Sequence, residues 1–227
     1  MAVIPNPTPQ LLQEAGRKST VRAIKPGDPI PYIFGRTLCT PGIITANDSG
    51  DWLYVDLLWS RGEIEGVEGF VIEGDFEGRG DEITDVAEHY TGTASQVASP
   101  IMSDLFGHTY DTLPNIAHSV MFAIPGKALD LKALVKGLKL YDPRTSPVST
   151  AYSTNPALAL ARIYQDCGYT LDWDSVATAA NYCDELVGSP QAKRWEIGVQ
   201  IWTRRQLDRW AAIFAQYCSV FVDIQGS

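Results

Sequence analysis

The sequence predicts an α+β protein: a β-barrel domain with an inserted polar segment, followed by a pair of helices and a small βαβ-like module. Two observations support this class. Short segments rich in β-branched and aromatic residues, separated by turn residues, fill residues 21–75. Apolar residues recur at helical spacing after residue 155, between one strand that ends near residue 141 and another near residue 195. We expect an N-terminal arm over residues 1–19, the barrel over residues 20–145 and an α+β domain over residues 146–227.

The barrel is predicted from short strands that turn signals separate. PGDP, TPG, NDSG and RGEIEG punctuate the segment, and NDSG at Asn47–Gly50 suits a hairpin loop. Strands at this spacing favour a barrel or a sandwich over βαβ repeats. The expected strands, of which the last two would complete the barrel, are Val21–Ile24, Ile30–Phe34, Gly42–Ala46, Trp52–Trp59, Phe70–Glu73, Ile116–Ile124 and Leu134–Tyr141.

Two segments of residues 1–145 lack this strand pattern. Gly78–Leu113 is polar and acidic with few runs of large apolar residues, so we expect an insertion that loops out of the β domain. It would carry a short helix near Ser95–Phe106. Met1–Ser19 contains three prolines and then LLQEAGRKS. It is expected to be an arm that packs on a neighbour or stays mobile.

The stretch Gly137–Glu185 organises the second half of the chain. A strand that ends at residue 141 is stopped by Asp142–Pro143, because proline cannot donate to a strand ladder and favours a turn. A polar run over residues 144–153 then crosses to a helix. Pro156 suits the first helical position, with Thr154 or Asn155 as the cap before it. The apolar stripe and the terminating glycine are Leu160, Ile163, Tyr164, Cys167 and Gly168.

A second helix and a strand–helix–strand unit follow. Asp172 or Asp174 can cap the second helix, and Thr203 with Gln206 forms a capping box for the last one. Residues 188–192 read as a linker, and residues 195–201 alternate apolar and polar side chains, which predicts a half-buried strand. The inner helix stripes are Val176, Ala179, Ala180 and Cys183, and then Leu207, Trp210, Ala211, Phe214 and Cys218.

The last predicted strand is Ser219–Ile224. Together with the strand at residues 195–201 it would give a sheet of only two strands, which is marginal alone. We therefore expect this unit to be completed by strands from elsewhere in the chain, from another chain, or from sequence beyond Ser227.

The composition bears on partners and compartment. A net charge of −9 and a pI of about 4.8 argue against a protein that grips nucleic acid by its phosphates. The four cysteines lack metal-type spacing, and most of them fall on apolar stripes, so buried free thiols are expected. There is no charged start followed by an apolar segment, and no apolar run near 20 residues. An unexported protein of a reducing compartment, without a membrane span, fits these features.

The candidate catalytic residues each have a simpler structural explanation. Paired carboxylates could serve a glycosidase, which holds two of them about 5–10 Å apart, but helix caps and turns account for them. The histidines are not spaced as zinc ligands, and none lies in an HExxH motif. A Cys–His nucleophile pair stays open, although no cysteine has a recognisable catalytic context. The residues weighed are Glu63/Glu65, Asp81/Glu82, Asp172/Asp174, Asp184/Glu185, His89, His108 and His118.

We therefore predict that the chain is not an enzyme and has no catalytic, cofactor-binding or metal-binding residues. The tryptophans are the remaining candidates, because they could line a carbohydrate groove. Most of them are in phase with core positions of strands or helices, so core packing is favoured. Trp202 breaks the alternation of its strand and is expected to be exposed and to face a partner. The others are Trp52, Trp59, Trp173, Trp195 and Trp210.

The order of several motifs resembles the tail-tip hub of long-tailed bacteriophages, the J-type tail-hub or host-specificity family. The strand GLKLYDPRT, then NPALAL, then an Asp-capped helix that ends in AANYCDE carry the resemblance. YIFGR at residues 32–36 and LWSRGEIEGVEGFVIEG at residues 58–74 agree with it. It covers most of residues 20–222, and the order of the motifs, rather than any one of them, makes it specific. Hubs of this type usually run to many hundreds of residues, so we expect an N-terminal part or a short form.

The resemblance implies a structural protein of the virion, assembled in the host cytoplasm. Such hubs form trimeric rings that close the tail tube, and their barrel domains imitate the tube subunits. The implied partners are the tape-measure protein, the distal tail protein and tail-fibre or receptor-binding proteins, and the ring takes part in channel opening for DNA ejection. An acidic lining would let DNA pass without binding it. The alternative is a tail-associated cell-wall hydrolase or carbohydrate-binding module, which would act as a monomer.

Overall fold

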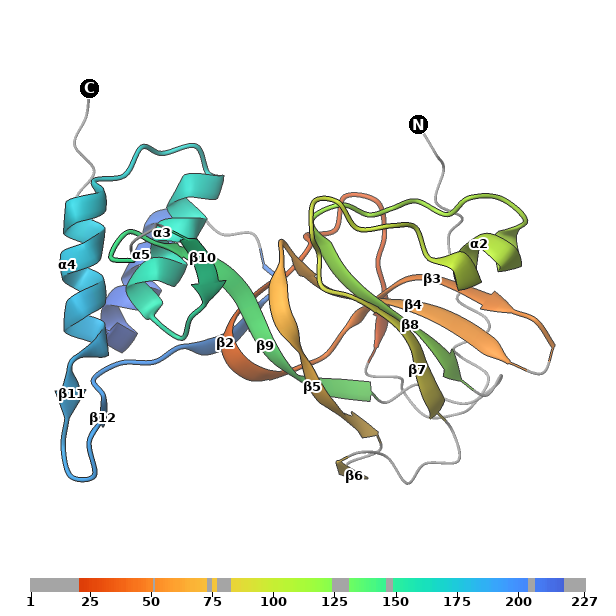
Figure 1. The fold of residues 1–227 in the computed structure, drawn as a ribbon, viewed down its shortest axis with the longest axis horizontal. Helices are drawn as coiled ribbons and strands as arrows, with labels where there is room; N and C mark the ends of the chain where they lie inside the picture. Colours follow the sequence, from red (N-terminus) through yellow and green to blue (C-terminus); the bar gives the residue numbers. More distant parts are fainter. Residues whose placement is uncertain are drawn as a thin grey trace.

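Two large β-sheets, a small two-stranded sheet and a group of helices make up the described part of the chain (Figure 1). In this computed structural model, the structure describes residues 21–50, 52–72, 75–76, 83–123, 131–145, 149–203 and 207–218. Figure 1 shows most of the two large sheets in one half of the molecule and, at the opposite end, three of the helices together with the small two-stranded sheet. The expected α+β class is confirmed.

The first sheet contains five strands in the order β1-β3-β4-β8-β7. β1 and β3 are parallel, and the other neighbours are antiparallel. Four of these strands were predicted, because their β-branched and aromatic residues are bounded by turn signals. The bounds are β1 (Arg22–Ala23), β3 (Gly42–Asp48), β4 (Leu53–Arg61), β8 (Ile116–Ala123) and β7 (Ile83–Tyr90).

The second sheet is antiparallel, in the order β13-β2-β9-β5-β6, and β10 also pairs with β9. β9 is its spine, since it pairs with three other strands. Gly35 lies in β2 with φ +64°, and a Cβ there would overlap the carbonyl oxygen of Ile197, so the YIFGR string needs its glycine. The bounds are β13 (Gly198–Ile201), β2 (Tyr32–Cys39), β9 (Leu131–Asp142), β5 (Ile64–Ile72), β6 (Asp75–Phe76) and β10 (Ser149–Tyr152).

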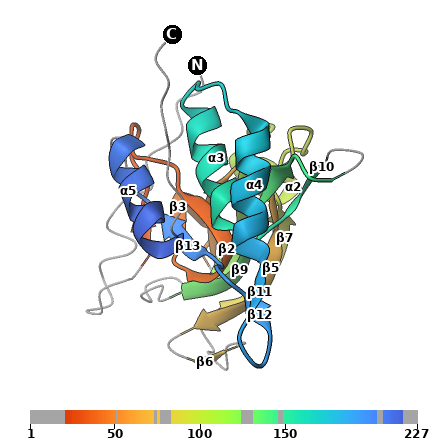
Figure 2. The same cartoon turned by 90° about the vertical axis from the view of Figure 1, so that its left-hand side faces the viewer.

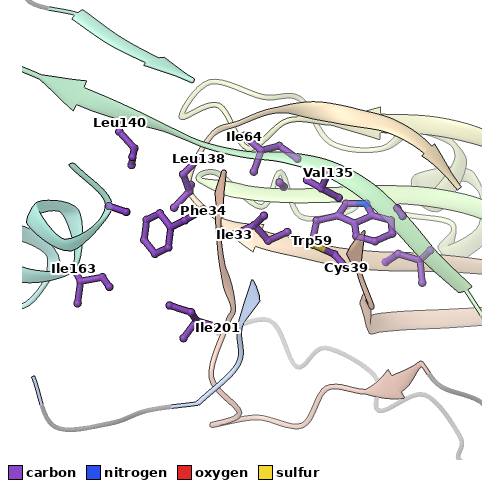
Figure 3. Packing of buried hydrophobic residues seen from close by; sticks show 14 of the residues in the cluster. Ile33, Phe34, Cys39, Trp59, Ile64, Val135, Leu138, Leu140, Ile163 and Ile201 are labelled. Atoms are coloured by element: carbon purple, nitrogen blue, oxygen red, sulfur yellow. The ribbon is translucent and has the colours of Figure 1, made fainter. Parts of the chain in front are cut away.

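The hydrophobic core lies between the sheets and continues beneath the helices (Figure 3). The expected closed barrel is wrong for the described strands, because the two larger sheets are separate. Where β2 approaches β4, the Arg61 amide donates to the Pro31 carbonyl (2.8 Å), but the Ile33 amide donates to the Ser60 side chain (3.3 Å). A bulge in β4 precedes Ser60. A side-chain oxygen thus takes the place of a ladder carbonyl, and the sheets meet without a continuous ladder.

The segment expected as an inserted loop, residues 78–113, is structured differently. β7 occupies Ile83–Tyr90 and pairs with β8 along its length. Two register shifts, at Ile83/Asp85 and Val86/Glu88, break the alternation of its side chains, which is why the sequence pattern does not reveal a strand. A short helix, α2 (Pro100–Phe106), follows, close to the predicted one.

The three larger helices lie together at one end of the molecule (Figure 2). They are α3 (Pro156–Asp166), α4 (Trp173–Asp184) and α5 (Leu207–Cys218). The sequence offered two possible cap residues for each of α3 and α4. The structure has Asn155 as the cap of α3 and Asp172 as the cap of α4. Apart from Cys167, the described side chains of the predicted stripes face the core, where Ala180, Cys183 and Phe214 are buried. No described helix has the length and apolar character needed to span a bilayer.

The connections between these elements differ from the expectation in two places. The polar run after β9 contains β10. The linker expected at residues 188–192 is instead the turn, residues 188–191, and the first strand residue of a hairpin formed by β11 (Leu186–Val187) and β12 (Ala192–Lys193). The strand predicted at residues 195–201 is β13, which pairs with β2 and so belongs to the second sheet; of the three stated sources of additional strands, the chain itself supplies this one. The predicted arm at residues 1–19, Gln206 of the capping box and the strand Ser219–Ile224 lie outside the described residues. The domain division at residue 145 stays a prediction.

Candidate functional site

Arg144 lies at the centre of the polar cluster that joins the second sheet to the helices. It follows β9 in the string YDPRT, and the turn at Pro143 folds it back onto Asp142. Its Nε donates to Asp142 Oδ1 (2.8 Å) and its Nη2 to Asp142 Oδ2 (2.7 Å). This two-point contact fixes the guanidinium plane, as a fork of donors on a carboxylate does. The hydrogen bonds from Arg144 hold the pKa of Asp142 below its usual value.

The same guanidinium reaches the end of α4. Nη2 donates to Asp184 Oδ2 (2.9 Å) and Nη1 to Asn181 Oδ1 (3.2 Å). Lys193 of β12 approaches Asp184 Oδ1 at 2.9 Å. Burial raises the pKa of Asp184, but hydrogen bonds from Lys193, Asn155 and Arg144 outweigh it and leave the pKa below its usual value. The charge is therefore held in place by partners from several elements.

Asn155 links the start of α3 to this cluster. Its side-chain oxygen accepts from the Ala157 and Leu158 amides (3.0 and 3.3 Å), and its Nδ2 donates to the Ala180 carbonyl of α4 (2.8 Å). The residue is fully buried at 0% exposure, so each of its bonds replaces one to water. The strings YDPRT, NPALAL and AANYCDE thus meet in one bonded cluster, which we call the junction: Asp142, Arg144, Asn155, Asn181, Asp184 and Lys193.

A second polar cluster lies beneath α2 and was not predicted. His118 Nδ1 is 2.7 Å from Asp56 Oδ1, and the Tyr110 hydroxyl donates to Asp56 Oδ2 (3.0 Å). A carboxylate paired with an imidazole is a common acid–base arrangement. Here Asp56 and His118 are 0% and 1% exposed, and the ring of Tyr90 stacks on the imidazole at 4.5 Å. A substrate cannot reach the pair in this arrangement, so its evident role is to anchor the segment after α2 to the first sheet.

The predicted candidate residues occupy separate places rather than one site. Asp172 caps α4, accepting from the amides of residues 174 and 175 at 3.1 and 3.4 Å. Glu63 and Glu185 form ion pairs with Lys139 (2.7 Å) and Arg194 (2.6 Å). Asp81 and Glu82 lie outside the described residues.

The histidines do not form a site with these carboxylates. His89 Nδ1 lies 2.7 Å from the Ser119 hydroxyl, and His108 is exposed beside a backbone carbonyl. His118, predicted to be partly buried and hydrogen-bonded, is fully buried and bonded. Neither the carboxylates nor the histidines are brought together as a catalytic set in the described ranges.

Three cysteines are buried as expected and one is not. Cys39, Cys183 and Cys218 belong to the core, and burial raises the pKa of Cys39 to about 12. Cys167 is exposed, because it follows the last residue of α3 and no longer faces the core. Thiols with raised pKa values are poor nucleophiles. The buried cysteines therefore act as small apolar side chains.

The tryptophans separate into core and cleft residues. Trp59 is fully buried, Trp195 packs on the core, and Trp173 contacts Tyr141 with ring centroids 4.6 Å apart. Trp52, expected in a core strand, is 38% exposed because it precedes β4. The expectation for Trp202 is met in part, since it is half-buried and lines a cleft of about 680 Å³ between the sheets and the helices. Trp210 lines the same cleft.

Comparisons with known proteins include a distant structural likeness. No family model matches the sequence, and no curated protein matches it. Among solved structures, a chain of the "Virion of native gene transfer agent (GTA) particle" aligns with a TM-score of 0.44 and 16% identity. The alignment covers 55% of this chain and 31% of that one. A TM-score this low does not establish a shared fold, so function has to be argued from this chain's own residues.

Proposed function

We propose that the chain is a structural component of a bacteriophage tail tip, where three copies form a hub ring that closes the tail tube. The proposal rests on the sequence resemblance and on one structural observation that supports it. The three motif strings that carry the resemblance lie apart in the sequence, yet their polar residues bond to one another in the junction. Motifs whose residues bond to one another belong to one structural unit. This is expected if the motifs identify a family of structural proteins.

Within this proposal the chain acts by binding rather than by catalysis. The sheets would present surfaces to neighbouring copies and to the tape-measure, distal tail and tail-fibre or receptor-binding proteins. The junction would keep the helices in a fixed position on the second sheet, because charged groups held by several partners resist displacement. The net charge of −9 would let DNA slide through the ring during ejection without being retained.

Native mass spectrometry of the purified chain, alone and with its tail partners, tests this proposal. Three chains of 24.9 kDa would give a closed assembly of 74.7 kDa (3 × 24.9). A chain that stays a monomer or forms a two-fold dimer, with and without the distal tail and tape-measure proteins, would overturn it. A separate assay addresses the hydrolase alternative, because a monomer that degrades purified cell-wall material would favour that function.

A further inference from the structure

Two cysteines from different helices meet in the core. Cys183 lies in the last turn of α4, and Cys218 is the last residue of α5. Their side chains are 0% and 1% exposed and belong to the same hydrophobic cluster. The two thiols are hydrogen-bonded to each other. The residues lie far apart in the sequence, so the fold, and no local motif, brings the two sulfur atoms together.

The surroundings of the pair set the direction of its hydrogen bonds. Cys218 Sγ donates to the Phe214 carbonyl oxygen (2.8 Å), which leaves its sulfur as the acceptor for the Cys183 thiol. The Cys183 carbonyl accepts from the Trp195 amide (3.0 Å), and this bond holds the backbone at the end of α4. The hydrogen bond to Cys218, and then burial, raises the pKa of Cys183. Both sulfurs are thus protonated and protected while the helices are packed together.

The position of Cys218 gives an oxidant a route to the pair. The last turn of a helix lacks some of its hydrogen bonds, so helix ends open at a lower free-energy cost than packed interiors. Opening of the last turn of α5 would expose the Cys218 thiol, while Cys183 stays on α4, which the junction holds through Asp184. On closing, two sulfur atoms in hydrogen-bond contact need only a short movement to reach the disulfide bond length of about 2.05 Å.

We propose that Cys183 and Cys218 form a dithiol site, which a low-molecular-weight disulfide oxidises to an internal disulfide that ties α5 to α4. In the first step the Cys218 thiolate attacks the external disulfide, so that a mixed disulfide forms and one small thiol leaves. In the second step the Cys183 thiolate attacks the Cys218 sulfur, and the second small thiol leaves. Two electrons pass from the protein to the external disulfide, and the two protons end on the small thiols.

The internal disulfide would form after folding and would stabilise the folded chain. Glutathione keeps thiols reduced in the cytoplasm, so the chain would fold and assemble as the dithiol, and a released particle would meet oxidising surroundings. This order of events rests on the proposed role in the virion, whereas the chemistry of the pair does not. The bond closes the loop between residues 183 and 218 and so lowers the entropy of the unfolded chain.

Peptide mapping of the intact chain without reductant tests the site. The folded chain is incubated with oxidised glutathione until the exposed Cys167 carries glutathione, and the remaining thiols are then blocked with N-ethylmaleimide. The expected product is a peptide pair linked through Cys183 and Cys218, which reductant separates. Cys39 is the matched control, because it is equally buried but its thiol donates to the Thr37 carbonyl (3.6 Å). It should remain a free thiol in the same digest.

Urea unfolding measures the effect of the bond. The oxidised chain should unfold at a midpoint about 1 M higher than the reduced chain, and Cys183→Ala and Cys218→Ala should each abolish the link and the shift. The inference is overturned if both cysteines stay free thiols once Cys167 is modified, if either links to Cys39 or to another chain, or if the linked chain unfolds at the same midpoint as the reduced one. The map of the unsubstituted chain decides the first two outcomes even where a variant does not fold. The oligomeric state of the reduced chain is measured separately, so failure of the link leaves the ring proposal unaffected.

Discussion

Replacing Arg144 with alanine removes the group on which the junction depends. Its guanidinium makes four side-chain hydrogen bonds, two to Asp142 and one each to Asp184 and Asn181. The side chains of Arg144, Asp142 and Asp184 are 21%, 18% and 23% exposed. The change therefore leaves two mostly buried carboxylates without their shared cation, which costs more than the loss of the contacts themselves.

The expected loss lies between two known limits. Breaking a fully buried ion pair by removing one partner costs about 3–5 kcal/mol, and an exposed pair is worth at most about 1 kcal/mol. With exposures near one-fifth, we expect Arg144→Ala to lower the free energy of unfolding by about 2–3 kcal/mol. For a urea slope of about 3 kcal/mol/M, the unfolding midpoint falls by about 1 M.

The loss depends on pH in a defined direction. The pKa of Asp142 is lowered in the folded state by Arg144, so its contribution is complete above the unfolded pKa, about 3.9, and is lost as the pH falls through the folded value. The difference between wild type and Arg144→Ala should thus be full at pH 7 and shrink below about pH 4.

Urea unfolding followed by circular dichroism measures these differences. Arg36→Ala is the matched control, because Arg36 pairs with Glu68 at 2.6 Å but its side chain is 55% exposed. It should shift the midpoint much less. Arg144→Lys should recover part of the loss, since it keeps the charge without the two-point contact. If Arg144→Ala and Arg36→Ala unfold at the same urea concentration, the junction does not stabilise the fold as argued.

Three further outcomes are expected. Phe214→Ala should cost about 3–5 kcal/mol in urea unfolding, because Phe214 is 3% exposed in the core; a nearly neutral change would contradict its placement. Asp56→Ala should lower the free energy of unfolding by about 2–4 kcal/mol, because it leaves the buried donors of His118 and Tyr110 unpaired. Tyr110→Phe removes only one bond to Asp56 and should cost about 1 kcal/mol. Equal losses in the two variants would refute this geometry. Iodoacetamide should label the native chain at Cys167 alone, read by peptide mass spectrometry, and early labelling of Cys39 would contradict its burial.

The helices follow from local signals in the sequence, and so they were predicted well. Asn155 and Asp172 start α3 and α4 through hydrogen bonds to amides two and three residues on. Their inner stripes need only the helical period. For each helix the sequence left two candidate cap residues open, because the side chains of both candidates can accept hydrogen bonds from the first helical amides.

The sheets depended on contacts that a single sequence does not contain. β7 was missed because its bulges shift the side-chain alternation. A barrel was predicted, but the two larger sheets are separate, and β2 meets the end of β4 through the Ser60 side chain rather than through a continuous ladder. Strand number and spacing are the same for a barrel and for two packed sheets.

The two polar clusters were also outside the reach of local patterns. All junction residues except Lys193 lie in the motif strings, but their bonds span up to 40 positions, as between Arg144 and Asp184. His118 and Asp56 are 62 positions apart. One signal was present: Asp56 interrupts the apolar run LYVDLLW, and a carboxylate in a buried strand requires a partner. It indicates that a partner exists without saying which residue it is.

Cryo-electron microscopy of purified particles of the phage that encodes this chain is the most direct test of the proposed hub ring. The account predicts density for three copies at the end of the tail tube, related by a three-fold axis, with the α3–α4 pair held to the second sheet through Arg144 in each copy. The account is contradicted if the chain lies elsewhere in the particle, if its copies do not follow three-fold symmetry, or if purified particles lack it.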